Sequence, residues 1–151
     1  MKTVEGNLIT LALDGGFDVI LHGCNCFHTM AAGIARPIAE TFPEALAADR
    51  ATPKGSRDKL GTISTAHVHR DGLDLTVVNA YTQFHYAGTG RKVDYDALSA
   101  CFGRVARSFP EARIGYPQIG AGLAGGDWSE IAPRIDTALA GMDHTLVVFA
   151  P

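Results

Sequence analysis

Short apolar runs alternate with longer amphipathic segments along the whole chain. Residues 18–22, 73–79 and 145–149 are almost continuously apolar and are bounded by turn formers. Such runs are typical of strands buried on both faces, as in a parallel sheet. Residues 60–69 alternate and predict a weaker strand, and 113–116 predict a short strand that ends at Pro117.

Helical patterns lie between these strands. Residues 34–42, 43–51, 94–109 and 128–139 carry helix signals, most of them apolar residues at three- and four-residue spacing. Pro37 predicts a late start or a kink in the first helix. Asp127 and Glu130 have the spacing of a capping box, but Pro133 would then lie deep in the helix, so Ser129 is an alternative N-cap. The polar, basic segment 50–58 predicts a surface loop.

This order of strands and helices predicts an α/β fold with a mainly parallel central sheet covered on both faces. The 151 residues show no internal repeat, so we expect a single domain, 1–151. A chain of this length buries enough surface to fold without disulfides or a metal. The 46% of hydrophobic residues run throughout the chain and exclude disorder.

Charge and cysteine content narrow the functional classes. Thirteen Lys and Arg against 16 Asp and Glu give a net charge of -3, which argues against a broad nucleic-acid surface. No apolar run is long enough to cross a membrane, and residues 1–6 have no apolar signal core. The three cysteines form no disulfide framework. We therefore expect a cytoplasmic protein without membrane association.

Six of the 17 glycines fall in two segments, 23–35 and 117–128, each of which follows a predicted strand. Parallel sheets bind ligands at the carboxyl ends of their strands, and a Gly-rich turn before a helix offers unpaired backbone N–H groups to phosphate. Two such loops at one edge suit a diphosphate, although plain tight turns are the alternative. No Lys follows Gly126 as in a Walker A motif, and Gly120 and Gly122 lack the third glycine of a dinucleotide motif.

The two loops, taken in order, resemble those of the macrodomain family of ADP-ribose-binding modules. Residues 4–9 are similar to the end of the family's first strand, 22–25 with 32–35 to its first phosphate loop, and 116–128 to its second. The similarity spans nearly the whole chain and implies a three-layer α/β/α fold. It is strongest to the group that processes ADP-ribose 1″-phosphate, whose distant relative is the terminal ADP-ribose protein glycohydrolase.

The resemblance also implies where a ligand would lie. Asn7 and the backbone N–H of Leu8 would contact adenine, and Phe149 would stack on it. Asn25 would bind the distal ribose, and Tyr81 is expected beside it. Backbone groups of the two loops would hold the diphosphate, namely Ala32, Gly33, Ile34, Ala35, Gly120, Ala121, Gly122, Leu123 and Ala124.

Three departures from the family pattern bear on catalysis. Tyr81 stands near the position of the catalytic Lys of the glycohydrolase relative, and Ala124 stands at the position of its Asp. The chain therefore lacks the two side chains that the covalent mechanism of that relative requires. Ala31 replaces a glycine that is frequent in relatives, and its methyl group restricts the loop backbone.

Other chemistry is possible in the first loop. His22, Cys24, Cys26 and His28 would share one face of an extended strand and are zinc-ligand types. Strand spacing cannot wrap four ligands around one ion, however, so we expect no metal. A cysteine nucleophile has no supporting motif. His28 is the best candidate for a general acid or base, with a solvated loop histidine as the alternative, and His85 could reach the mouth of the site.

We therefore expect a monomeric macrodomain that needs no cofactor and binds ADP-ribose or an ADP-ribosylated protein or nucleic acid. The expected reaction is hydrolysis at the distal ribose, of ADP-ribose 1″-phosphate or of an ADP-ribosyl adduct. Asn25 would position the ribose or the water, and His28 would assist proton transfer. The alternative is a reader that binds the ligand without hydrolysing it.

Overall fold

A computed structural model describes residues 1–150, and Pro151 lies outside the described residues. Within them, one six-stranded sheet has the order β1-β6-β5-β2-β4-β3. Its strands are β1 Lys2–Gly6, β2 Val19–Cys24, β3 Ile63–Arg70, β4 Leu73–Tyr81, β5 Ile114–Tyr116 and β6 His144–Phe149. All pairings in this order are parallel except β3 with β4. The predicted mixed, mainly parallel sheet is therefore confirmed.

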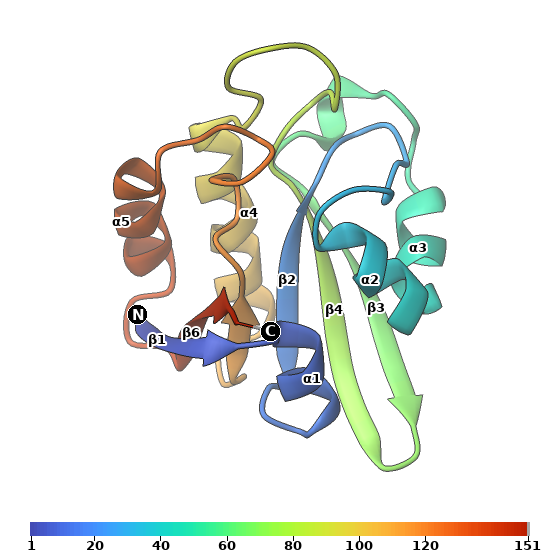
Figure 1. The fold of residues 1–151 in the computed structure, drawn as a ribbon, viewed down its shortest axis with the longest axis vertical. Coiled ribbons are helices and arrows are strands. Elements are labelled where there is room, and N and C mark those ends of the chain that lie inside the picture. The colour runs from blue at the N-terminus through green and yellow to red at the C-terminus, as the bar shows by residue number, and fades with distance from the viewer. Residues whose placement is uncertain (151) are drawn as a thin grey trace.

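Helices cover both faces of the sheet (Figure 1). They are α1 Leu8–Leu13, α2 Ala35–Thr41, α3 Pro43–Arg50, α4 Tyr95–Ser108 and α5 Trp128–Ala138. Helices α4 and α5 enclose one apolar core against the sheet, with Phe102 and Ile131 fully buried. Helices α1, α2 and α3 enclose the second core on the opposite face, around Ile38 and Ala45. The predicted three-layer α/β/α architecture is confirmed.

The two central strands run two residues further than the apolar pattern indicated. β2 continues to Cys24, which pairs in parallel register with Tyr81 at the end of β4. The apolar runs predicted strand ends at residues 22 and 79, where each run ends on a polar side chain. In the structure the polar His22 and Asn79 are fully buried and joined by a 2.6 Å hydrogen bond, so the strands continue. As a result, Asn25 is the first residue beyond β2.

The starts of α5 and α2 decide two points that the sequence left open. Asp127, and not Ser129, is the N-cap of α5, because its Oδ1 accepts a 2.9 Å hydrogen bond from the Ser129 backbone N–H. Pro133 does lie inside this helix. Helix α2 begins at Ala35, so Pro37 falls in the first turn, where a missing N–H costs no intrahelical hydrogen bond.

Two other elements differ from the pattern. The six-residue helix α1 was not predicted, because it is too short to show periodicity; Asn7 caps it by accepting a 3.1 Å hydrogen bond from the Thr10 N–H. β3 begins at Ile63, three residues later than expected. Segment 50–58 is mainly turn, as predicted, and passes into a short 3₁₀ helix, Arg57–Lys59. No helix among the described residues combines the length and apolar character needed to cross a bilayer.

Candidate functional site

Both glycine-rich loops lie at the carboxyl edge of the sheet, on adjacent strands. The first follows β2 and the second follows β5, and these strands pair directly. After β2 the chain adds β4 and β3 on one side, and it then crosses back to place β5 and β6 on the other. The loops therefore face each other at the point where the strand order reverses, which is where open α/β sheets form clefts.

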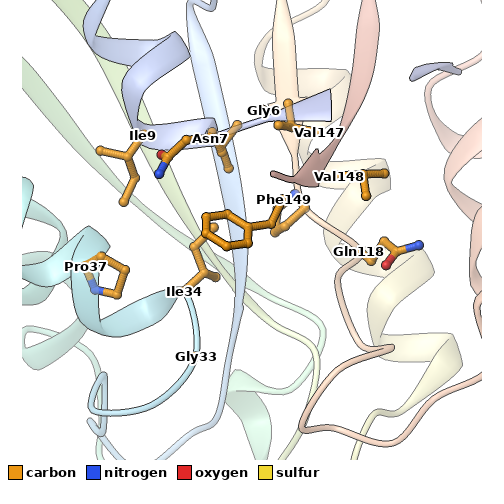
Figure 2. A pocket seen from close by; sticks show the side chains of 12 residues that line it. Gly6, Asn7, Ile9, Gly33, Ile34, Pro37, Gln118, Val147, Val148 and Phe149 are labelled. Carbon is orange, nitrogen blue, oxygen red and sulfur yellow. The ribbon is translucent and has the colours of Figure 1, made fainter. Parts of the chain in front are cut away.

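The first part of the cleft is an apolar cavity of about 410 Å³. It is lined by Gly6, Asn7, Leu8, Ile9, Gly33, Ile34, Pro37, Pro117, Gln118, Val147, Val148 and Phe149. Figure 2 shows the Phe149 ring projecting across this cavity, with Asn7 and Ile9 to one side and Gln118 to the other. Phe149 is 72% exposed although it is aromatic, which leaves a ring face open to a flat ligand.

Polar groups converge at one end of this cavity. The Asn7 carbonyl oxygen caps α1, so one of its two lone pairs is used and one remains for a ligand donor. Leu8 is the first residue of α1, and its backbone N–H therefore has no acceptor within the helix. The structure brings Asn7, Leu8 and Phe149 together around one cavity, as a base-binding site requires.

The second part of the cleft is a cavity of about 540 Å³ between the two loops. It contains most of the residues expected there from sequence, namely Asn25, Ala32, Gly33, Ile34, Ala35, Gly120, Gly122, Leu123 and Ala124. Gly33, Ile34, Pro117 and Gln118 line both cavities. The two cavities therefore form one elongated cleft along the edge of the sheet.

Asn25 braces the first loop. Its Oδ1 accepts a 2.8 Å hydrogen bond from the Phe27 N–H, and its Nδ2 donates to Thr29 Oγ1 at 2.6 Å. Asn25 is only 8% exposed, yet it lines the second cavity. It is thus fixed in orientation at the cavity wall, with the loop backbone shaped around it.

The second loop is folded back on itself by backbone hydrogen bonds. The Gly126 N–H donates to the Gly120 carbonyl at 2.7 Å, and Gly120 has a left-handed φ of 81°. The Ala124 carbonyl accepts from the Lys92 N–H at 2.7 Å. This last bond ties the segment between β4 and α4 to the second loop and brings Lys92 to the cavity.

Three residues expected at the site line neither cavity. His28 turns its Nε2 to the Thr52 carbonyl oxygen at 2.6 Å and lines neither cavity. Tyr81, the last residue of β4, is fully buried, and its hydroxyl donates to Asp49 Oδ1 at 2.7 Å. Ala121 belongs to the second loop, and its side chain packs against the apolar core. The side-chain directions that decide these placements are not encoded in spacing along the chain.

The sequence interpretation missed several residues that line the second cavity. They are Gly23, Cys24, Thr29, Ala31, Thr82, Gln83, Tyr86, Lys92, Pro117, Gln118 and Ile119. Among residues 1–150, Lys92 is the only Lys or Arg that lines the cleft. It could have been found from sequence, because residues 88–92 form another glycine-containing, basic segment between a strand and a helix. His85 lines neither cavity, but it stacks on Tyr86, which lines the second, with ring centroids 4.6 Å apart.

The cysteines next to the first loop are poor nucleophiles. Burial raises the pKa of Cys24 well above its ordinary value, and burial also raises the pKa of Cys26. Within residues 1–150, His22, Cys24, Cys26 and His28 do not gather around one point, because His22 is bonded to Asn79 and His28 to Thr52. Neither thiolate catalysis nor a four-ligand metal site fits this arrangement.

Comparison with known proteins identifies a relative whose sequence aligns with the full length of this chain. An uncharacterised 17.5 kDa protein of bacteriophage T4 is 33% identical over 157 residues, covering 100% of this chain and 97% of the phage protein. A DNA ADP-ribosyl glycohydrolase of Mycobacterium tuberculosis is 23% identical over 89% of this chain, and the match spans 38% of that relative's length. No protein-family model matches the sequence.

Solved structures agree with the fold. The macrodomain of Mycobacterium tuberculosis DarG superposes with a TM-score of 0.76 at 19% identity, over 99% of this chain and 97% of that one. A macrodomain protein of Streptomyces coelicolor reaches a TM-score of 0.66 at 28% identity, over 85% and 86% of the two chains. Thermosipho africanus DarTG in complex with ADP-ribose reaches 0.74 at 13% identity, over 100% of this chain and 42% of that one.

The fold, with its cleft between two loops at the switch point, is that of a macrodomain. The chain belongs to the macrodomain family and shares a family with the phage T4 17.5 kDa protein.

Proposed function

We propose that this protein binds ADP-ribose in its cleft and hydrolyses an ADP-ribosyl derivative at the distal ribose. The observation that carries the proposal is the continuity of the two cavities through Gly33, Ile34, Pro117 and Gln118. Along the cleft, an apolar compartment is followed by a middle part lined with backbone groups and then by a polar end. This order matches the base, the diphosphate and the distal ribose of ADP-ribose.

Adenine would lie in the first cavity. Phe149 offers a ring face for stacking, while the Leu8 N–H and the free lone pair of the Asn7 carbonyl oxygen offer hydrogen bonds to the base edge. The apolar lining excludes water from these bonds, which strengthens them.

The diphosphate would lie between the two loops. The backbone N–H groups at the start of α2 have no acceptors within that helix, and the second loop approaches from the other side without large side chains at Gly120 and Gly122. Lys92 adds a positive charge that offsets part of the charge of a phosphate group.

The names of the relatives support the same ligand and reaction. One structural neighbour was solved with ADP-ribose, and a curated relative is a DNA ADP-ribosyl glycohydrolase. At the far end of the cleft, Asn25 and its braced loop would position the ribose and the attacking water, with Lys92 stabilising the negative charge of the leaving group. Positioning of this kind contributes roughly 7–11 kcal/mol to catalysis in favourable cases.

A second candidate function is that of a reader that binds ADP-ribose without hydrolysing it. It is favoured by one observation: the described lining of the second cavity contains no carboxylate and no histidine. A general base for water would then have to come from the substrate itself.

One set of measurements tests both candidates. Calorimetry with ADP-ribose tests binding, and turnover is followed with ADP-ribose 1″-phosphate, an ADP-ribosylated protein and ADP-ribosylated DNA. We expect micromolar binding and turnover of at least one substrate. Binding without turnover of any of the three would leave the reader function, and the absence of ADP-ribose binding would overturn the proposal as a whole.

Substitutions in the cleft test whether binding and turnover take place there. Lys92→Ala is expected to weaken binding or turnover about tenfold or more, because a charge-assisted hydrogen bond contributes about 1.5–3 kcal/mol. Lys54→Ala is the matched control, because Lys54 is exposed and lines neither cavity. If the two substitutions have equal effects, Lys92 does not contact the ligand.

A further inference from the structure

A cluster of metal-binding side chains lies outside the cleft, on the exposed face of the β3–β4 hairpin. His67 and His69 come from β3 and Asp74 comes from β4, and one ligand atom from each lies within 4.8 Å of the other two. It is the only such group of three among residues 1–150. Figure 1 shows that the hairpin turn lies at the end of the molecule opposite the 84–93 loop.

The sheet register explains why these side chains meet. His67 and His69 are two residues apart on one strand, so they point to the same face. Asp74 pairs directly with His69 across the antiparallel ladder, and His67 Nε2 is hydrogen-bonded to Asp74 Oδ1. The opposite face of β3 buries Ala66 and Val68 against the core, which prevents a shift of register.

The hairpin holds the three groups on a rigid frame. Its two-residue turn is formed by Asp71 and Gly72, with left-handed φ values of 50° and 79°. Such turns fix the pairing of the strands on either side. Arg70, the nearest cation on β3, is turned to the other face, where it donates to Glu44 Oε2 at 2.7 Å. No positive charge of this strand therefore competes for the Asp74 carboxylate.

From this geometry we propose that His67, His69 and Asp74 bind a divalent transition-metal ion of the zinc class. Two imidazoles and one carboxylate are ligands that such ions prefer, whereas Mg²⁺ and Ca²⁺ prefer oxygen ligands throughout. Ligand atoms around zinc lie about 3.3 Å apart, so exposed side chains such as His67 and Asp74, at 61% and 71% exposure, need only small rotations.

Binding requires no change in the fold. The ion lies between His67 Nε2 and Asp74 Oδ1, and an imidazole that binds it through Nε2 is neutral and carries its single proton on Nδ1. Water completes the coordination, because the site is open to solvent. The ion crosslinks β3 to β4 at the edge of the sheet and leaves the cleft unaffected.

The test uses the full chain without a histidine tag. Calorimetry with ZnCl₂ and, separately, NiCl₂ at pH 7.5 is expected to show one site per chain that EDTA reverses. The double variant His67→Ala/His69→Ala is expected to bind at least tenfold more weakly, and Asp74→Asn several-fold more weakly. His85→Ala removes another exposed histidine and is the matched control.

A second readout separates ligation from a general effect on folding. Zinc is expected to raise the Tm of the wild-type protein and of His85→Ala, and to leave that of the double variant unchanged. Circular dichroism checks that each variant folds, which we expect because these side chains are exposed. The proposal is overturned if the wild-type protein binds neither metal, or if the double variant binds as tightly as the wild type.

Discussion

The imidazole Nε2 of His28 lies 2.6 Å from the backbone carbonyl oxygen of Thr52. This bond ties the first loop to the segment after α3, and His28 has a left-handed φ of 61° that is rare for a residue with a side chain. The histidine that sequence spacing favoured as an acid or base is therefore engaged in holding the loop.

We predict that His28→Gln changes any hydrolysis rate no more than about threefold and leaves the shape of its pH profile unchanged. The same substitution is expected to lower the free energy of unfolding by about 1 kcal/mol, because one hydrogen bond is lost. Denaturant unfolding and a pH–rate profile measure the two effects. Loss of one limb of the pH profile would restore His28 as a catalytic group.

Because the ring of Phe149 is exposed, we predict that its removal weakens ADP-ribose binding without destabilising the fold. Phe149→Ala should weaken ADP-ribose binding by about 1–3 kcal/mol, by analogy with bases that stack on aromatic side chains. Its Tm should remain close to that of the wild type, because the side chain is 72% exposed.

Leu13→Ala is the control for this substitution. Leu13 is an exposed hydrophobic residue, at 47%, that lines neither cavity. Calorimetry on both variants should show a loss of affinity for Phe149→Ala alone. Unchanged affinity of Phe149→Ala would place the base elsewhere.

Close packing at Gly126 predicts that the second loop tolerates no side chain there. A Cβ on Gly126 would lie 2.6 Å from the Gly120 carbonyl oxygen and 2.6 Å from Val93 Cγ1. We expect Gly126→Ala to cost about 1–3 kcal/mol of unfolding free energy, as overpacking does. It should also weaken ADP-ribose binding, because the loop must open.

Gly122→Ala provides the comparison within the same loop. A Cβ at Gly122 meets nothing within 4 Å, so its unfolding free energy should change little. Thermal or urea unfolding of the two variants measures the difference. Equal stability of the two would contradict the packing argument.

Buried His22 predicts a loss of stability in mild acid. Burial lowers the pKa of this histidine below its ordinary value of about 6.5, although the hydrogen bond to Asn79 acts in the opposite direction. The unfolded chain then binds more protons than the folded one between the two pKa values. The contribution of His22 to the free energy of unfolding is therefore largest above about pH 6.5 and decreases as the pH falls below that value.

Urea unfolding at pH 7.5 and 5.5 tests this dependence, and NMR of the imidazole ring assigns it. The His22 ring should keep the shifts of the neutral form at pH 5.5. In His22→Gln the loss of stability between the two pH values should be smaller than in the wild type. His85→Gln, which changes an exposed histidine, should behave as the wild type does. A protonated His22 ring at pH 5.5 in the folded protein would contradict this prediction.

The layered fold and the location of the cleft could be predicted from the amino-acid sequence. Apolar runs such as 18–22 form strands wherever both faces are buried, and glycine-rich turns after parallel strands must meet at one edge of the sheet. For the same reason, most of the backbone-lined residues of the two loops could be predicted from their positions alone, because backbone groups do not depend on side-chain direction.

Which side chains reach the cleft depends on contacts that form only in the folded chain. His28 and Tyr81 follow predicted strands, and Lys92 precedes a predicted helix. The partners at 2.6 Å and 2.7 Å turn the first two away from the cleft, and the loop contact at Ala124 brings Lys92 to it. The His67, His69 and Asp74 cluster likewise depends on strand register. Directions and pairings of this kind arise from contacts between segments distant in sequence, and local spacing does not contain them.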